Sequence, residues 1–180
     1  MAIFDAVERA LSVVKTNFNA DMKALVAAKV TAGALKQGEA DQIDQTATIY
    51  DRLPSEVFAA HPEGDDDDLG LPGVGVYSGP MTTQAKWQGK RDSRAVIVLD
   101  YFAIGADPRL LEIQVELAIE VLLRAVDRIP DAAAAGQFGA GEDPDSVQVL
   151  PFLLAQTQGL DFYQDRATVT FPILDQDTGL

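Results

Sequence analysis

Apolar residues recur at intervals of three and four near the start of the chain. From about Ile3 to Lys29 they return at these intervals, while charged residues lie off the stripe. This is the period of an amphipathic α-helix that packs one face against a core. Two glycines, Gly33 and Gly38, then interrupt the pattern, and so a connection is predicted from Thr31 to Asp44. The residues of the stripe are Phe4, Val7, Leu11, Val14, Phe18, Leu25 and Val26.

The segment from Pro108 to Ile129 has the same period, and apolar residues cover well over half of its helical circumference. Asp107 suits the N-cap and Pro108 suits the first turn. Pro130 is expected to end the helix. The broad apolar surface predicts burial on a sheet and also against a second helix or a neighbouring subunit. The positions at helical spacing are Leu110, Ile113, Leu117, Val121 and Arg124, beside Leu111, Ala118, Leu122, Val126 and Ile129.

Segments rich in β-branched and alternating apolar residues predict strands. The clearest is Arg94 to Ile104, which we expect at the centre of its sheet. In Ala167 to Leu174 the apolar residues alternate with threonines, which predicts a strand with one buried face. The other predicted strands are Ala47–Leu53, Gly73–Tyr77 and Val147–Leu154.

The predicted order is helix, strand, strand, strand, helix, strand, strand. Only one helical crossover is evident, which argues against a doubly wound parallel sheet. An α+β fold is expected, with a mainly antiparallel sheet flanked by two long helices. The length of 180 residues fits one domain with a real core, residues 1–180. Long loops are predicted at about 54–72, 78–92 and 131–145.

The net charge is −14, from 28 acidic and 14 basic residues. Such a chain is a poor phosphate binder, because nucleic-acid affinity comes mostly from Lys and Arg. Two interpretations of the charge stay open. It keeps the protein dispersed in solution, or it repels a polyanion such as DNA that passes close by. Composition alone favours the first.

Composition also bears on the cellular compartment of the protein and on whether it contacts a membrane. The chain has no cysteine, which excludes disulfides and thiolate metal sites and fits a cytosolic origin. Its apolar stretches fall far short of the ~20 residues that span a bilayer, so no membrane partner is expected. The acidic residues Asp5 and Glu8 interrupt the N-terminal segment before the apolar region of a signal peptide could form, so no signal peptide is expected there.

The stretch HPEGDDDDLGLPGVGVY holds the only histidine, His61, and four consecutive aspartates, Asp65, Asp66, Asp67 and Asp68. His61 with Asp65 and Asp67 is the candidate metal site. A calcium loop needs oxygens at alternate positions, whereas consecutive residues in an extended chain point to opposite sides. One histidine is thin support for a transition metal. The stretch is therefore predicted to be a solvated acidic loop, with no metal and no cofactor.

Catalytic motifs are missing from the sequence. No Gly-x-Ser-x-Gly elbow presents a nucleophile, and a serine triad would have to use His61. Gly70, Gly73 and Gly75 match neither the dinucleotide-binding pattern nor the P-loop, and a strand rather than a helix follows them. We therefore predict no catalytic residues and no enzymatic activity.

A basic segment surrounds the only tryptophan. Lys86, Trp87, Lys90 and Arg91 lie close together in a chain that is otherwise acidic. One interpretation is contact with nucleic acid or with an acidic protein surface. The acidity of the chain favours protein, and the segment would then contact the aspartate loop, Asp65 to Asp68, of a neighbouring subunit through complementary charge. The other is a solvated hairpin with Trp87 folded back as a lid. Both stay open at this point.

The layout of the chain resembles the tail terminator (tail completion) proteins of long-tailed bacteriophages. The resemblance covers the first helix, then LPGVGVY, then RAVIVLDYFAIGADPRLLEIQVELAIEVLLRAVDRI, and closes with DRATVTFPI. It is one of layout and not of a diagnostic motif. It implies a small α+β protein that forms a hexameric ring closing the tail tube beneath the head. The family has no catalytic residues, so none is carried over.

The resemblance implies a structural virion protein, made in the host cytoplasm, that ends tail-tube polymerisation and joins tail to head. The expected partners are further copies of the chain, the tail-tube protein and the head connector or neck proteins. DNA is expected to pass through without specific binding. The alternatives are another head–tail connector or neck protein, an acidic protein-binding module, and a metal-dependent enzyme that uses the aspartate loop.

Overall fold

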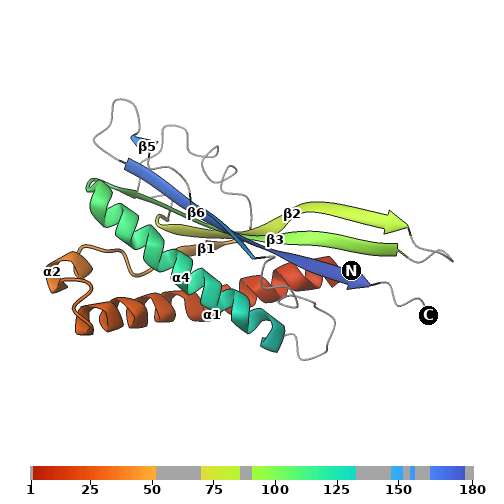
Figure 1. Cartoon of the computed structure of the whole chain (residues 1–180), viewed down its shortest axis with the longest axis horizontal. Helices are drawn as coiled ribbons and strands as arrows, with labels where there is room; N and C mark the ends of the chain where they lie inside the picture. Colours follow the sequence, from red (N-terminus) through yellow and green to blue (C-terminus); the bar gives the residue numbers. More distant parts are fainter. Residues whose placement is uncertain are drawn as a thin grey trace.

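The computed structural model describes residues 2–51, 70–85, 91–132, 147–151, 155–156 and 163–176. In this part of the chain, helices lie on one face of a six-stranded sheet (Figure 1). The α+β class predicted from the sequence is confirmed, as are the two long helices. The helices are α1 (Ala2–Thr31), α2 (Gln37–Ala40) and α4 (Pro108–Ala132). The strands are β1 (Thr48–Tyr50), β2 (Gly73–Ala85), β3 (Arg91–Gly105), β4 (Gln148–Pro151), β5 (Ala155–Gln156) and β6 (Tyr163–Gln176).

The described strands lie in the order β1-β2-β3-β6-β4, and β5 pairs with a further part of β6. Strand β1 runs parallel to β2, and the remaining pairs are antiparallel. The prediction of a mainly antiparallel sheet is therefore confirmed. Strand β3 pairs with β2 on one side and with β6 on the other, as expected for the most apolar segment.

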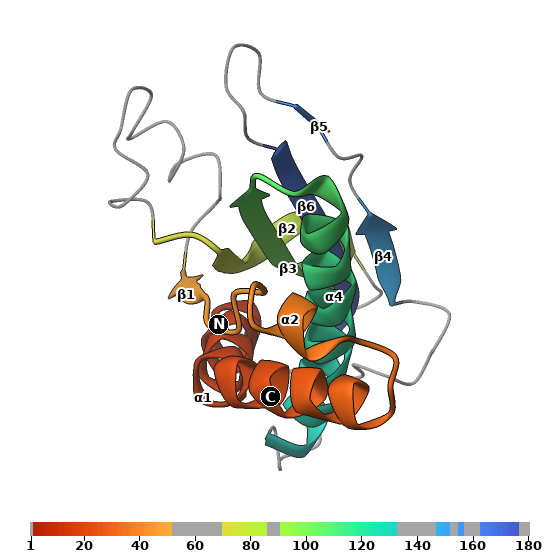
Figure 2. The same cartoon turned by 90° about the vertical axis from the view of Figure 1, so that its left-hand side faces the viewer.

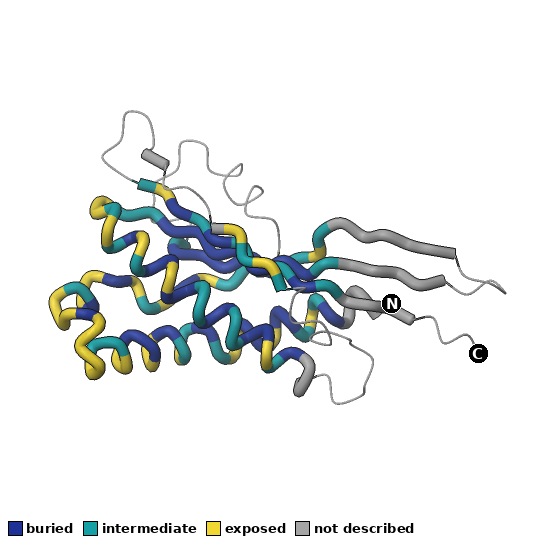
Figure 3. Tube along the Cα trace, in the orientation of Figure 1, coloured by how far each residue is buried: buried dark blue, intermediate teal, exposed yellow. Residues whose placement is uncertain are grey.

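The core lies between the sheet and the long helices. Helix α4 packs on the sheet and also against α1 (Figure 2). Most of its apolar side chains are buried as a result. The second surface that the sequence predicts for this helix is thus covered by α1. Alternate residues of β3, among them Leu99 and Tyr101, are fully buried in this core. Figure 3 shows the buried residues gathered along the facing sides of the sheet and the long helices. The ring of Tyr101 stacks on Phe18 of α1, with 6.0 Å between the ring centroids.

Two polar side chains fix the segment between α2 and β1. Asn19 accepts a hydrogen bond from the Ala47 backbone N–H at 2.8 Å and donates to the Ala47 carbonyl at 3.3 Å. Gln114 of α4 donates to the Tyr101 hydroxyl at 2.8 Å and accepts from the Asp44 N–H at 3.1 Å. Because a buried polar group is costly unless it is paired, these contacts fix how the segment enters the sheet.

Several predicted boundaries are corrected. The loop predicted at 78–92 is wrong over most of its length, because β2 continues to Ala85 and β3 begins at Arg91. Residues 78–85 and 91–92 lack apolar alternation, so their own pattern does not predict strands. They form strands because they continue the backbone hydrogen-bond ladders that begin at the apolar half of β3. Helix α4 continues past Pro130 to Ala132. The predicted connection from Thr31 to Asp44 contains the one-turn helix α2.

The far end of the sheet extends past the ends of both long helices (Figure 1). We call this end the arm. It consists of Met81–Ala85 of β2, Arg91–Ala95 of β3 and Ile173–Gln176 of β6. A register irregularity between Ser78 and Met81 separates the arm from the rest of β2. Bulges of this kind bend a strand and increase its twist.

Candidate functional site

Four polar side chains gather on the sheet face opposite the helices. Residues that lie opposite each other in an antiparallel pair share a face. Asp100 of β3 lies opposite Thr168 of β6, and Phe102 lies opposite Arg166. Since Leu99 and Tyr101 enter the helix-covered core, Asp100 between them points to the other face. Tyr77 of β2 belongs to this second face as well.

These residues converge on the carboxylate of Asp100, which is fully buried. Arg166 donates to it from two nitrogens, through Nε to Oδ1 at 2.6 Å and through Nη2 to Oδ2. The Thr168 hydroxyl donates to Oδ1 at 3.0 Å, and the Tyr77 hydroxyl donates to Oδ2 at 3.1 Å. A carboxylate offers about four acceptor positions, and these donors occupy all of them. We call Tyr77, Asp100, Arg166 and Thr168 the Asp100 cluster.

Burial and charge set the protonation of the cluster. Burial raises the pKa of Tyr77 to about 12, and the neighbouring Asp100 carboxylate adds to the effect. The hydrogen bond to Asp100 raises the pKa of Arg166 above its ordinary value. At neutral pH Tyr77 is therefore a neutral donor and Arg166 carries its charge. The cluster ties three neighbouring strands together, and its carboxylate has no lone pair left for a metal or a proton transfer.

An aromatic pair continues the same face toward β1. Tyr50 stacks on Phe102 with ring centroids 6.2 Å apart. The Phe102 ring lies across Gly73, where an added Cβ would be 2.6 Å from its Cζ atom. Glycine is therefore required at this position by the close approach of the ring. Phe102 thus contacts both β1, through Tyr50, and β2, through Gly73. In the sheet Phe102 itself lies opposite Arg166.

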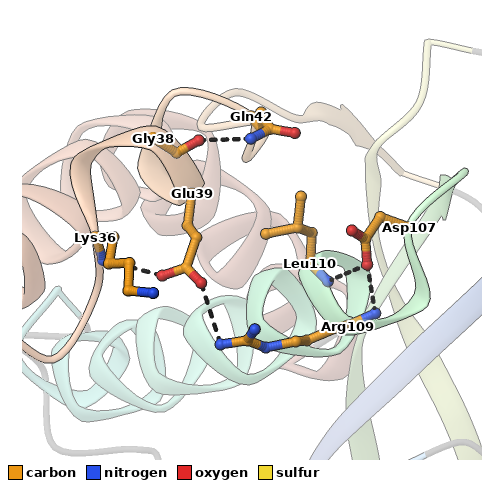
Figure 4. A network of polar contacts seen from close by, with 7 residues as sticks. All are labelled: Lys36, Gly38, Glu39, Gln42, Asp107, Arg109 and Leu110. Carbon is orange, nitrogen blue, oxygen red and sulfur yellow. Dashed lines mark hydrogen bonds and ion pairs between the residues drawn. The ribbon is translucent and has the colours of Figure 1, made fainter.

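A groove of about 300 Å³ lies on the helical side of the molecule, between the end of α1, α2 and α4. Both of its cations are paired. Lys29 lies 3.0 Å from Glu120. Arg109 lies 3.1 Å from Glu39, a contact drawn in Figure 4. Such mixed and mutually paired charges do not make a phosphate site, which needs unopposed donors. The groove lining is Lys29, Ala34, Leu35, Glu39, Arg109, Ile113, Glu116, Leu117 and Glu120.

Polar contacts beside the groove fix the start of α4. Asp107 Oδ1 accepts from the backbone N–H groups of Arg109 at 2.9 Å and Leu110 at 3.2 Å (Figure 4). The N-cap predicted from the sequence is therefore confirmed. Glu39 accepts from the Lys36 backbone N–H at 3.0 Å, and so it holds the first turn of α2 as well as Arg109.

Most of the site residues predicted from the sequence lie outside the described residues. This applies to His61, to Asp65 through Asp68, and to Lys86, Trp87 and Lys90. Arg91 is the first residue of β3, and only its backbone is described. Within the described ranges, no group of three potential metal-ligating side chains comes together. No helix in those ranges is long and apolar enough to cross a membrane.

The Asp100 cluster is the site that sequence reasoning missed. One signal was present, because Asp100 interrupts the otherwise apolar segment AVIVLDYFAI. A carboxylate in the middle of a buried strand needs a partner. Arg166, in the alternating strand DRATVTF, was the matching cation. Their meeting depends on the register of β3 with β6, which the pattern alone does not set.

No protein-family model matches this chain, and a search of curated proteins found no match.

Proposed function

We propose that this chain is a structural subunit of a ring at the head-proximal end of a bacteriophage tail. In this function the ring ends tail-tube polymerisation and joins the tail to the head. Its partners are further copies of the chain, the tail-tube protein and the head connector or neck proteins. The protein is made in the host cytoplasm and ends in the virion. The proposal starts from the layout of the chain, which resembles tail terminator proteins.

The observation that carries the proposal is the shape of the two-layer fold. The described helices lie on one face of the sheet, and β2, β3 and β6 extend past them as the arm (Figure 1). A subunit that closes into a ring needs two different surfaces for its two neighbours. The arm supplies strand edges and backbone beyond the protein's own core, which suits contact between subunits.

The charge of the chain also supports the proposal. A conduit must let DNA pass without holding it, and a net charge of −14 opposes phosphate binding. Five of the cations in the described ranges, Lys29, Arg109, Arg124, Arg128 and Arg166, are each paired with a carboxylate. Paired cations contribute little to binding a polyanion.

The Asp100 cluster fits a structural function better than a chemical one. Four donors occupy its carboxylate, and its tyrosine hydroxyl is held neutral well above physiological pH. An activated nucleophile or a general base would instead need an open position and a pKa near the working pH. The cluster fastens the three strands that lead into the arm.

The experiment combines solution mass, imaging and tube growth. The purified chain is measured by light scattering and negative-stain microscopy, alone and with polymerising tail-tube protein. The proposal predicts rings and tubes that stop growing when the chain is added. A strict monomer at high concentration that leaves tube length unchanged would contradict it. A ring that binds heads without stopping tube growth would indicate a neck protein instead.

A pair of matched variants sharpens this experiment. Adding two acidic charges to the arm, with Thr83→Glu and Gln84→Glu, is expected to weaken the ring, because adjacent strand residues place a charge on both faces. Adding the same charges to exposed positions of α1, with Ser12→Glu and Thr16→Glu, is expected to leave it intact. Equal effects of the two variants would count against the arm as the contact surface.

A further inference from the structure

We propose that copies of this chain join through strand pairing in the arm. The outer edge of β2 in one copy pairs with the outer edge of β6 in the next, so that the sheet continues from subunit to subunit. This inference rests on the proposed ring and names the surfaces that close it. The partner is a second copy of the same chain.

Both edges are unpaired among the described residues. Strand β1 pairs only with Gly73–Gly75 of β2, far from the arm. Strand β4 pairs with residues 167–170 of β6, and β5 pairs with residues 163–164. Beyond these points, alternate backbone N–H and C=O groups of each edge have no described strand beside them. Such an edge is a template for pairing with another chain.

The sequence of the arm does not protect these edges. Soluble proteins blunt exposed edges with proline, lysine or bulges. Pro80 and Pro172 lie just before the arm segments of β2 and β6, and the bulge in β2 lies there too. The arm segments themselves, Met81–Ala85 and Ile173–Gln176, contain neither proline nor lysine, and Asp175 is their one charged residue. The β2 segment therefore has none of these protective features, and the β6 segment has a single charge.

Opposite charges make a second copy the fitting partner. Strands β2 and β6 are each antiparallel to β3, so they run in the same direction. In a side-by-side copy of the same orientation, the end of β6 lies next to the end of β2. The β6 segment carries Asp175 and leads to Asp177, while the β2 segment leads to Lys86 and Lys90. Complementary charge of this kind favours the pairing and sets its direction.

Pairing two different edges is also what a ring requires. A heterologous contact closes into a ring when the rotation between copies permits it, whereas pairing β2 with β2 gives a closed two-fold dimer. Cysteines introduced on the two edges distinguish these modes, because a disulfide between copies forms only where the two edges meet.

The chain allows a clean cross-linking test because it contains no cysteine. Thr82 and Leu174 lie opposite Arg94 from its two sides. Two strand spacings separate them within one copy, roughly 9–10 Å, beyond the ~7 Å limit for a disulfide. A bond between Thr82→Cys and Leu174→Cys therefore joins two copies. Gln84→Cys with Leu174→Cys tests a second register on the same face.

The double variants and each single variant are oxidised and separated under non-reducing conditions, and thermal unfolding checks that each variant folds. The proposal predicts a ladder of covalent multimers up to the size of the ring for at least one double variant. Single variants are expected to give no covalent multimers. Asp175→Lys is expected to reduce the ladder severalfold. Dimers from Thr82→Cys alone would show β2–β2 pairing and overturn the proposal.

The outcomes separate this inference from the proposed function. Rings seen by microscopy without any cross-linked ladder would overturn edge pairing and leave the ring function standing. A ladder with no effect on tube growth would support edge pairing and overturn the terminator function. Monomers that neither cross-link nor affect tube growth would overturn both.

Discussion

Replacing Arg166 with methionine removes the cation of the Asp100 cluster while keeping most of its aliphatic stem. The Asp100 carboxylate is fully buried and takes two of its four hydrogen bonds from Arg166. In the variant only Tyr77 and Thr168 remain as donors. A buried charge is then left without its counter-ion, so we expect the folded state to be destabilised.

The magnitude follows from how far water can replace the lost cation. Removing one partner of a buried ion pair costs about 3–5 kcal/mol. The Arg166 side chain is 36% exposed, so solvent screens part of the interaction. We therefore expect the free energy of unfolding to fall by about 2–3 kcal/mol. For a chain of this size, this lowers Tm by roughly 5–10 °C.

The assay is urea unfolding of the wild type, Arg166→Met, Asp100→Asn and the double variant. The double-mutant cycle is expected to give a coupling energy of about 1 kcal/mol or more between the two residues. Arg124→Met is the matched control, because its partner Glu120 is 40% exposed and such helix pairs contribute about 0.3–0.5 kcal/mol. A loss no larger than the control's, or a coupling energy near zero, would refute the reasoning.

Three further predictions use the same unfolding measurement. Gly73→Ala places a Cβ 2.6 Å from an aromatic ring and is expected to cost about 1–3 kcal/mol, whereas Gly38→Ala meets nothing within 4 Å and is expected to be neutral or stabilising. The opposite ranking would contradict the close approach. Asn19→Ala loses two hydrogen bonds to a distant backbone and is expected to cost about 1–2 kcal/mol, while Asn17→Ala loses only a bond within its own helix and is expected to change little. The raised pKa of Tyr77, about 12, stabilises the fold below pH 10, and this contribution is lost as the pH rises toward 12. Tyr77→Phe is expected to lose less stability over that window, and an equal loss in both proteins would rule out the assignment.

The sequence was sufficient for the elements whose residues carry a strong apolar period. The stripe through Leu11, Val14 and Phe18 predicted α1, and those residues are buried. Alternation in β6 predicted its buried face, and Asp107 was identified as the N-cap of α4. In each case burial on one face is what forms the element, so the pattern carries the information.

The arm and the Asp100 cluster were not predictable in the same way. Residues 81–85 of β2 form a strand because they continue a ladder begun by Val74 and Val76, not because of their own pattern. Asp100 and Arg166 are 66 residues apart in sequence and meet only once β3 and β6 are in register. Pairing over such separations is set by the whole sheet and not by any local segment.

The orientation of the hydrogen bonds in β2, β3 and β6 has a mechanical consequence. In an antiparallel sheet these bonds run perpendicular to the strands. A pull along the arm therefore loads them in shear, so many bonds must break at once before one strand slides past another. The Asp100 cluster bridges the same three strands across their hydrogen bonds. Force that enters at the arm is thus shared by β3 and passed to the sheet under α4, instead of peeling one edge strand away.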